Sequence, residues 1–280
     1  MKNWFVYMIM MLFLASCSEQ QIMEETVSST KLTEQKSLTV NPQDSVMSLL
    51  NHARWGDGSA YLKLADCYRD GFGVKKDFFG MIMMAEIAEK RGGIQKADDY
   101  INNLPDGHEY KTLLLLMDEY KSYIQENADS VMQVLREKRS PEAQTLLGFI
   151  MMDQGDTITA KYLIDEAANQ GCSLAKLLLT VPDWKGNARA DAAKLVIIAD
   201  QMPLAYYLLG NLYYEPDEKG ETNKQLAVEY YMKAEERAVL GRRGALRILD
   251  YYRNGGKVRL TEDDVKRLEL IVQQKSVETE

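Results

Sequence analysis

Histidine and cysteine are scarce in this sequence of 280 residues, which has two of the first and three of the second. His52 and His108 do not stand in a metal-binding spacing. Neither Cys67 nor Cys172 has a CxxC neighbour, so we predict no metal site. No serine lies in a nucleophile-elbow motif, and no glycine-rich loop resembles a phosphate cradle. The sequence therefore predicts no catalytic residues and no cofactor, in a protein that is not an enzyme.

The apolar stretch near the N-terminus is too short for a membrane span. Residues 4–14 carry no charge, but a helix that crosses a bilayer needs about 20 apolar residues. Lys2 precedes this stretch and small residues follow it, which is the layout of a secretory signal peptide. We therefore predict that residues 1–16 are removed on export.

The stretch ends in an aliphatic residue, two small residues and a cysteine, which are Leu14, Ala15, Ser16 and Cys17. This motif resembles the lipobox of bacterial lipoproteins. The resemblance implies cleavage between Ser16 and Cys17, a diacylglyceryl group on the Cys17 thiol and an acyl group on the new amino terminus. One acyl chain binds a membrane only marginally, whereas two or more hold firmly. The alternatives are an ordinary signal peptide with a chance cysteine and an uncleaved apolar anchor.

Residues 18–43 contain no aromatic residue and are rich in serine, threonine, glutamate and glutamine. Such a composition cannot bury enough apolar surface to offset the entropy lost on ordering. We therefore predict a lipidated flexible tether at residues 17–43, a helical repeat domain at 44–275 and a disordered tail at 276–280. A coil of this length would span roughly 25–30 Å, which would hold the folded part away from the membrane.

The chain is acidic, with a net charge of −8 at pH 7. No basic patch is apparent in the sequence, which argues against nucleic acid as a partner. It also argues against attraction to an anionic lipid surface, apart from the attached lipid. The expected partners are the membrane, through Cys17, and an unidentified envelope protein or peptide.

An internal repeat organises the rest of the chain. Six stretches begin with alanine and continue in a helical apolar pattern, and they start at Ala60, Ala97, Ala143, Ala175, Ala205 and Ala245. The copies at residues 60–68 and 205–213 both fit A-x-x-x-L-[GA]-x-x-Y. The small residues would let two helices approach closely, and the leucine and tyrosine would fill the seam between them.

This pattern resembles the Sel-one-like repeat, a relative of the tetratricopeptide repeat. Residues 58–92 carry the strongest copy, including the loop GFGV at 71–74 and Asp77. Further copies lie at residues 141–171 and 203–238, and weaker ones at 175–200 and 243–256. The resemblance implies an all-α fold, a right-handed α-solenoid of helix hairpins that bury their apolar faces against one another. Residues 97–140 depart from the pattern and are predicted to form one or two longer, irregular helices.

Both ends of the repeat domain are predicted to be helical. Residues 44–53 have the pattern of a first helix, and Thr261, followed by acidic residues, resembles the N-cap of a last one. Val265, Leu268 and Val272 would give that last helix an apolar stripe. The last helix would then cap the final repeat.

Cys67 and Cys172, the two cysteines outside the lipobox, fall in different copies of the repeat. An exported protein could join them in a disulfide. Their separation by two or more repeat units instead predicts two small buried side chains.

Tyrosines crowd the last third of the chain, in doublets at 206–207, 213–214, 230–231 and 251–252. Tyrosine favours interfaces because it buries a large area at a small entropic cost. Tyr213 and either Tyr230 or Tyr231 occupy core positions of the repeat that the chain resembles. The extra doublet members, Tyr207, Tyr214 and Tyr252, are our candidate partner-binding residues and are predicted to lie on a concave surface.

These features predict an envelope lipoprotein that acts as a scaffold or adaptor for another protein. Ser18 resembles the residue that directs enterobacterial lipoproteins to the outer membrane. One alternative is a binding component of an outer-membrane glycan or nutrient capture system, with Trp55 or Trp184 exposed. The third is an envelope hydrolase, against which the lack of a catalytic motif argues.

Overall fold

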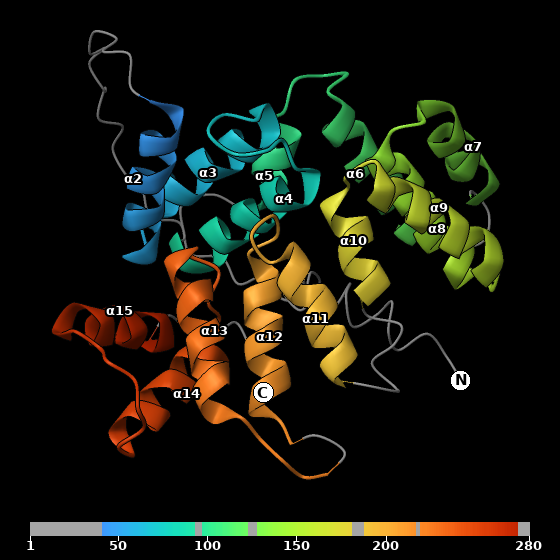
Figure 1. Cartoon of the computed structure of the whole chain (residues 1–280). Helices are drawn as coiled ribbons and strands as arrows, with labels where there is room; N and C mark the ends of the chain where they lie inside the picture. The colour runs from blue at the N-terminus through green and yellow to red at the C-terminus, as the bar shows by residue number, and fades with distance from the viewer. Residues whose placement is uncertain (1–40, 93–96, 123–127, 181–187, 217–218, 274–280) are drawn as a thin grey trace, which may run out of the picture.

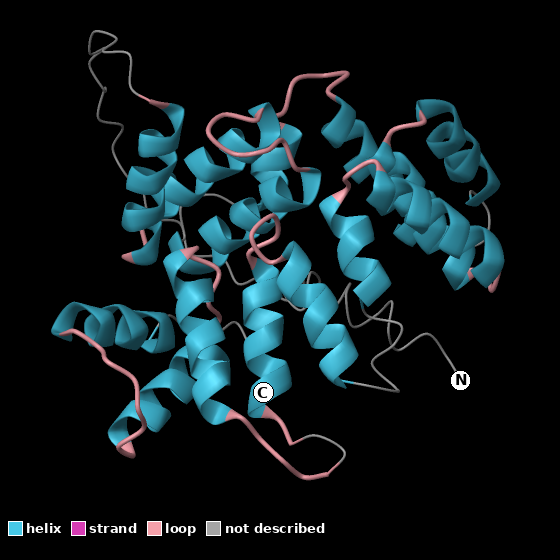
Figure 2. Ribbon diagram, viewed as in Figure 1, coloured by secondary structure: helices cyan, strands magenta, loops and turns pink. Residues whose placement is uncertain are grey.

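The computed structural model describes residues 41–92, 97–122, 128–180, 188–216 and 219–273 (Figure 1). Within these ranges the secondary structure is helical and contains no strand (Figure 2). The helices are α2 (Pro42–Arg54), α3 (Gly58–Asp70), α4 (Phe78–Ile87), α5 (Ala97–Asn102), α6 (Glu109–Ser122), α7 (Ala128–Lys138), α8 (Pro141–Asp153), α9 (Thr157–Asn169), α10 (Ser173–Thr180), α11 (Ala188–Ile198), α12 (Leu204–Tyr214), α13 (Lys224–Glu236), α14 (Arg242–Arg253) and α15 (Glu262–Gln273). The predicted signal peptide, nearly all of the predicted tether and the predicted tail lie outside the described residues.

Short polar side chains begin the helices at the turns of the repeats. Asp57 accepts hydrogen bonds from two backbone amides in the first turn of α3, and Asp156 accepts one from the amide of Thr159 in α9. Such N-caps satisfy amide groups that have no partner within the helix. α3 is capped at its C-terminal end by Gly71, whose φ of 75° is the left-handed conformation that glycine adopts without strain.

Consecutive helices pair as hairpins, and these pack into an all-α solenoid, as predicted (Figure 1). The pairs are α3 with α4, α8 with α9, α10 with α11, α12 with α13, and α14 with α15. A Cβ atom added at Gly210 would lie 2.3 Å from the ring of Tyr231, and one added at Gly148 would lie 2.7 Å from Ile164. Both glycines stand five positions after the first alanine of their repeat, so the predicted close helix approach at this position is confirmed.

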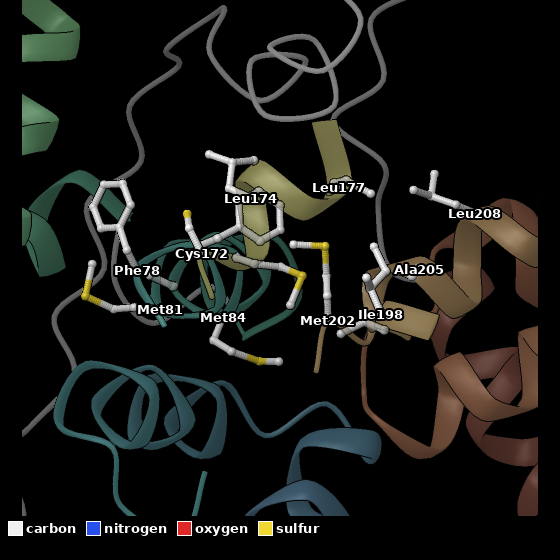
Figure 3. Packing of buried hydrophobic residues seen from close by; sticks show 14 of the residues in the cluster. Phe78, Met81, Met84, Cys172, Leu174, Leu177, Ile198, Met202, Ala205 and Leu208 are labelled. Carbon is white, nitrogen blue, oxygen red and sulfur yellow. The ribbon is translucent and has the colours of Figure 1, made fainter. Parts of the chain in front are cut away.

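The first hairpin also contacts repeats that come much later in the chain. Phe78, Met81 and Met84 of α4 belong to the same buried cluster as side chains of α10, the end of α11 and α12 (Figure 3). At the start of α4, the Ser173 hydroxyl of α10 donates a hydrogen bond to the Asp77 carboxylate. In an open solenoid each repeat contacts only its neighbours. This chain is therefore folded back on itself more closely than the repeat pattern predicted.

Charged side chains join the first helix to two of the last. Glu235 of α13 accepts hydrogen bonds from Arg54 of α2, at 2.6 and 3.0 Å, and from Arg267 of α15, at 3.0 Å. Arg267 also pairs with Asp264. Glu235 is only 2% exposed, so these arginines compensate a charge that burial would otherwise disfavour. We call these four residues the α2–α13–α15 junction.

Two predictions about helix boundaries are wrong. In residues 97–122 and 128–140, the part of this stretch that the structure describes, there are three helices, α5, α6 and α7, where one or two longer ones were predicted. The turn between α5 and α6 contains Gly107, whose φ of 80° a continuous helix does not allow. α2 begins two residues earlier than predicted, because Asn41 caps it by accepting a hydrogen bond from the Gln43 amide.

The predicted last helix is confirmed as α15. The Thr261 hydroxyl accepts a hydrogen bond from the Asp264 amide, and the Asp264 carboxylate accepts one from the Thr261 amide. This reciprocal arrangement satisfies two amides at the start of the helix. The predicted apolar stripe packs on the core through Val265, Leu268 and Val272.

Candidate functional site

Six tyrosines of the α12–α13 hairpin form two sets. Seven residues make about two helical turns, so tyrosines seven positions apart on α12 share a face. The adjacent tyrosines of α13 point in different directions. The ring of Tyr230 stacks on those of Tyr206 and Tyr213, and the ring of Tyr231 lies tilted against those of Tyr207 and Tyr214. We name the sets the first ladder (Tyr206, Tyr213 and Tyr230) and the second ladder (Tyr207, Tyr214 and Tyr231).

The second ladder lies in the seam between α12, α13 and α14. Tyr231 is fully buried, and its hydroxyl donates to Asn211 at 2.8 Å and accepts from Arg247 at 2.6 Å. Arg247 also pairs with Glu215, and its guanidinium lies 4.1 Å from the ring centroid of Tyr214. Burial raises the pKa of Tyr231 to about 12, although Arg247 opposes this shift. Tyr231 is therefore protonated at neutral pH and donates within a satisfied polar network.

The structure separates the three predicted binding tyrosines. Tyr207 is half-buried beside Gly244 at the start of α14, and Tyr214 is half-buried against Arg247. Tyr252, near the C-terminal end of α14, is 41% exposed. Tyr207 and Tyr214 thus meet in a seam between helices, whereas Tyr252 lies on a different part of α14. Their part in partner binding stays a prediction.

The first ladder lies beside the exposed part of α13. Tyr213 and Tyr230 are half-buried, and their rings stack with centroids 5.7 Å apart and an interplanar angle of 10°. The ammonium group of exposed Lys233 lies 5.5 Å from the ring centroids of both Tyr206 and Tyr230. The face of an aromatic ring attracts such a cation. This ladder therefore combines aromatic and cationic groups near the surface.

Sequence reasoning did not identify the first ladder. The sequence predicted that either Tyr230 or Tyr231 lies in the core, and this is confirmed for Tyr231. It also predicted a core position for Tyr213, but the structure shows that residue only half-buried. The signal that could have revealed the ladder is the seven-residue spacing of the two doublets on α12. Combined with one doublet on the partner helix, that spacing produces two parallel rows of rings.

The described residues include no group of three or more histidine, cysteine, aspartate or glutamate side chains placed to hold a metal ion. His52 is exposed, and Nδ1 of His108 accepts a hydrogen bond from the Tyr110 amide. In the same part of the chain no helix is both long enough and apolar enough to cross a membrane.

Cys67 and Cys172 are free thiols in the core, and the prediction that both are buried is confirmed. Burial raises the pKa of both thiols. The Thr145 hydroxyl lies within hydrogen-bond distance of the Cys172 sulfur, at 3.3 Å. These cysteines are therefore protonated core side chains at neutral pH.

Some candidate residues lie outside the described part of the chain. These are the lipobox residues Leu14, Ala15, Ser16 and Cys17, together with Trp184. Trp55, the other candidate tryptophan, is 46% exposed at the end of α2. The guanidinium of Arg267 lies 5.3 Å from its ring centroid.

Comparison with known proteins finds similarity among solved structures. No protein-family model matches the sequence, and no curated protein matches it either. One similar structure is a protective antigen of uropathogenic Escherichia coli with an SLR fold, at 20% identity and a TM-score of 0.40 over 84% of this chain. Another is a Sel1 repeat protein from Oxalobacter formigenes, at 22% identity and a TM-score of 0.40 over 82% of this chain. The matches cover 56% and 66% of those two chains, less than two thirds of either.

Proposed function

We propose that this protein is a lipid-anchored envelope scaffold that binds another protein through the first ladder and the adjoining surface of α13. The observation that carries the proposal is the stack of Tyr213 and Tyr230 with Lys233 beside it. Aromatic side chains contribute much of the binding energy in protein interfaces, because they bury large area and lose few rotatable bonds. A surface that already holds its aromatic rings in place loses less entropy on binding.

The second ladder stabilises the helix that carries Tyr230 of the first ladder. Tyr231 and Arg247 fix α13 against α12 and α14 through hydrogen bonds of 2.6 and 2.8 Å. Since Tyr230 is the neighbour of Tyr231 on α13, this network also fixes the position from which Tyr230 reaches Tyr213. The rigid seam therefore preorganises the surface that we propose as the binding site.

The anchor in this proposal is the lipid on Cys17, with the outer membrane as the location. It is supported by the motif Leu14-Ala15-Ser16-Cys17 after an apolar stretch of signal-peptide length. A tether of about 25 residues would leave the helical domain free to meet a partner that is held in the same membrane.

Site-specific photocrosslinking tests the binding surface. A photoreactive amino acid replaces Glu229, which is exposed on α13 next to Tyr230, in tagged full-length protein in native membranes. The matched control carries it at Lys161, which is exposed on α9. We expect a discrete crosslinked protein from position 229 and not from position 161. Equal crosslinking from both positions, or from neither, would contradict the proposal.

The anchor has its own test, in which Cys17→Ala is compared with the wild type. We expect the wild-type protein in the membrane fraction with labelled fatty acid attached, and the variant released from that fraction without label. Equal membrane retention of both proteins would contradict lipid anchoring. It would not affect the proposed binding surface, which the crosslinking experiment tests independently.

Glycan binding is a second candidate function, favoured by the exposed ring of Trp55. Arg267 lies on one side of this ring, so a sugar would have to stack on the other. Binding on a glycan array that is lost in Trp55→Ala would support this candidate. Partner capture at position 229 without any glycan signal would exclude it.

A further inference from the structure

One stretch before the last helix departs in charge from the rest of the protein. The whole sequence has a net charge of −8, yet residues 242–259 contain six basic residues and a single acidic one, Asp250. The basic residues are Arg242, Arg243, Arg247, Arg253, Lys257 and Arg259. These residues are spread over eighteen positions, so no basic patch is apparent in the sequence. Arg242, Arg243, Arg247 and Arg253 lie on α14, and Lys257 and Arg259 lie on the segment that follows it.

Five exposed residues share one face of α14, because their spacings of three, four and seven correspond to one or two helical turns. They are Arg242, Arg243, Leu246, Asp250 and Arg253. Leu246 is 38% exposed, so this face presents an apolar side chain among its charges. Arg247 points elsewhere, into the seam with the second ladder. We call the exposed face, together with Lys257 and Arg259, the α14 basic face.

The basic groups of this face differ in how they are satisfied. Arg253 pairs with Glu269 of α15 at 3.1 Å, and Arg242 donates to the Val272 carbonyl at 3.2 Å. Arg243, Lys257 and Arg259 form no ion pair with any residue that the structure describes, and all three are exposed. Their charges are therefore available to a ligand without the loss of an existing pair.

We propose that the α14 basic face binds an acidic peptide segment of a partner protein, one whose carboxylates meet Arg243, Lys257 and Arg259 while an apolar residue packs on Leu246. This inference rests on the proposed scaffold function and names the chemistry of the partner. Arginine clusters recognise acidic motifs because the guanidinium donates to carboxylates in a fixed geometry. In a protein with an overall negative charge, a local basic face also steers an acidic segment to one place.

A peptide fits this face better than an anionic membrane does. Asp250 lies on the same helix face and Glu269 lies beside Arg253, so a flat anionic surface would meet carboxylates as well as arginines. A narrow peptide can place its acidic side chains between them.

The test uses the purified full-length protein and a fluorescein-labelled peptide of glutamates with two leucines, with glutamine replacing glutamate in the control peptide. We expect the acidic peptide to bind in an anisotropy titration and to bind more weakly at higher salt, since exposed charges are screened over about 10 Å at 0.1 M. The variant Arg243→Glu/Lys257→Glu/Arg259→Glu should lose at least about ten-fold in affinity. The matched variant Lys63→Glu/Arg136→Glu/Lys161→Glu changes the net charge equally at exposed positions on α3, α7 and α9, and should stay within about two-fold.

Three results would overturn the proposal. They are equal binding of the glutamine peptide, an equal loss in the matched variant, and binding of phosphatidylglycerol vesicles to the basic face when the acidic peptide does not bind. Crosslinking from position 229 separates this inference from the proposed function. If the partner is still captured there while the acidic peptide fails to bind, the basic-face proposal fails and the scaffold proposal stands.

Discussion

The arginines of the α2–α13–α15 junction and those of the α14 basic face behave in opposite ways. In the α2–α13–α15 junction, Arg54 and Arg267 hold a single buried carboxylate, Glu235, at 2.6–3.0 Å. On the α14 basic face, Arg243 and Arg259 are exposed and have no ion-pair partner among the described residues. An arginine side chain thus has a structural role where burial makes an unpaired charge costly. It is available for binding where water solvates its charge.

Arg247 is an intermediate case. It is largely buried in the seam, where it donates to Tyr231 and Asn211 and lies over the ring of Tyr214. One face of α14 therefore packs against α12 and α13 through Arg247, and another face presents Arg243, which is exposed and has no ion-pair partner among the described residues. Substitutions should therefore reduce stability most in the junction, less in the seam and least on the basic face, where they should affect binding instead.

The largest effect is expected in the junction. Glu235→Ala leaves the guanidinium groups of Arg54 and Arg267 partly buried without their shared carboxylate, and should lower the free energy of unfolding by about 3–5 kcal/mol. Urea denaturation monitored by circular dichroism measures this change. A loss below about 1 kcal/mol would show that water replaces the carboxylate easily, and the contrast with the basic face would then disappear.

A smaller effect is expected in the seam. Arg247→Met keeps much of the side-chain volume and removes the hydrogen bonds to Tyr231 and Asn211, so it should cost about 1–3 kcal/mol. Thermal and urea unfolding provide the measurement. An unchanged free energy of unfolding would show that Arg247 contributes no more to stability than the exposed arginines do, and would contradict the proposed order of effects.

Tyr231→Phe should cost about 1 kcal/mol, because it removes one donated and one accepted hydrogen bond while retaining the ring. Its pH dependence gives a second readout. Burial raises the pKa of Tyr231 to about 12, above the usual value near 10. The stabilising contribution of its protonated form is present below about pH 10 and is lost as the pH rises toward about 12. The variant should therefore show a shallower loss of stability across that interval, and an identical pH profile would contradict this account.

The smallest effect on stability is expected on the basic face. Arg243→Ala removes an exposed charge without an ion-pair partner among the described residues and should change the free energy of unfolding by less than about 0.5 kcal/mol. Urea unfolding of this variant beside Lys63→Ala, which is exposed on α3, provides the control. A loss of 2 kcal/mol or more, on the order of a buried-group substitution, would show that Arg243 supports the fold.

Local features of the fold could be predicted from the sequence because they depend on nearby residues. The small position of the repeat identified Gly148 and Gly210, where a Cβ would collide with the partner helix. The cap at Thr261 depends on Asp264, three positions away. Such signals stay within one hairpin, and that is why the all-α repeat architecture was predicted correctly.

Long-range features could not be predicted in this way. The pair between Arg54 and Glu235 joins residues 181 positions apart, and no local sequence pattern predicts it. The burial of Tyr207 and Tyr214 depends on where α14 packs, which the doublets themselves do not specify. The basic face was not predicted because its charges are spread over eighteen positions, and the exposed side of α14 that carries Arg242, Arg243 and Arg253 is defined only by how this helix packs.

The most direct test of this account measures unfolding and peptide binding on the same two variants. Glu235→Ala should lose stability while the fraction that remains folded binds the acidic peptide with the affinity of the wild type. The variant Arg243→Glu/Lys257→Glu/Arg259→Glu should keep wild-type stability and lose the peptide. Loss of both properties in both variants would contradict the claim that buried charges close this fold while exposed charges bind its partner.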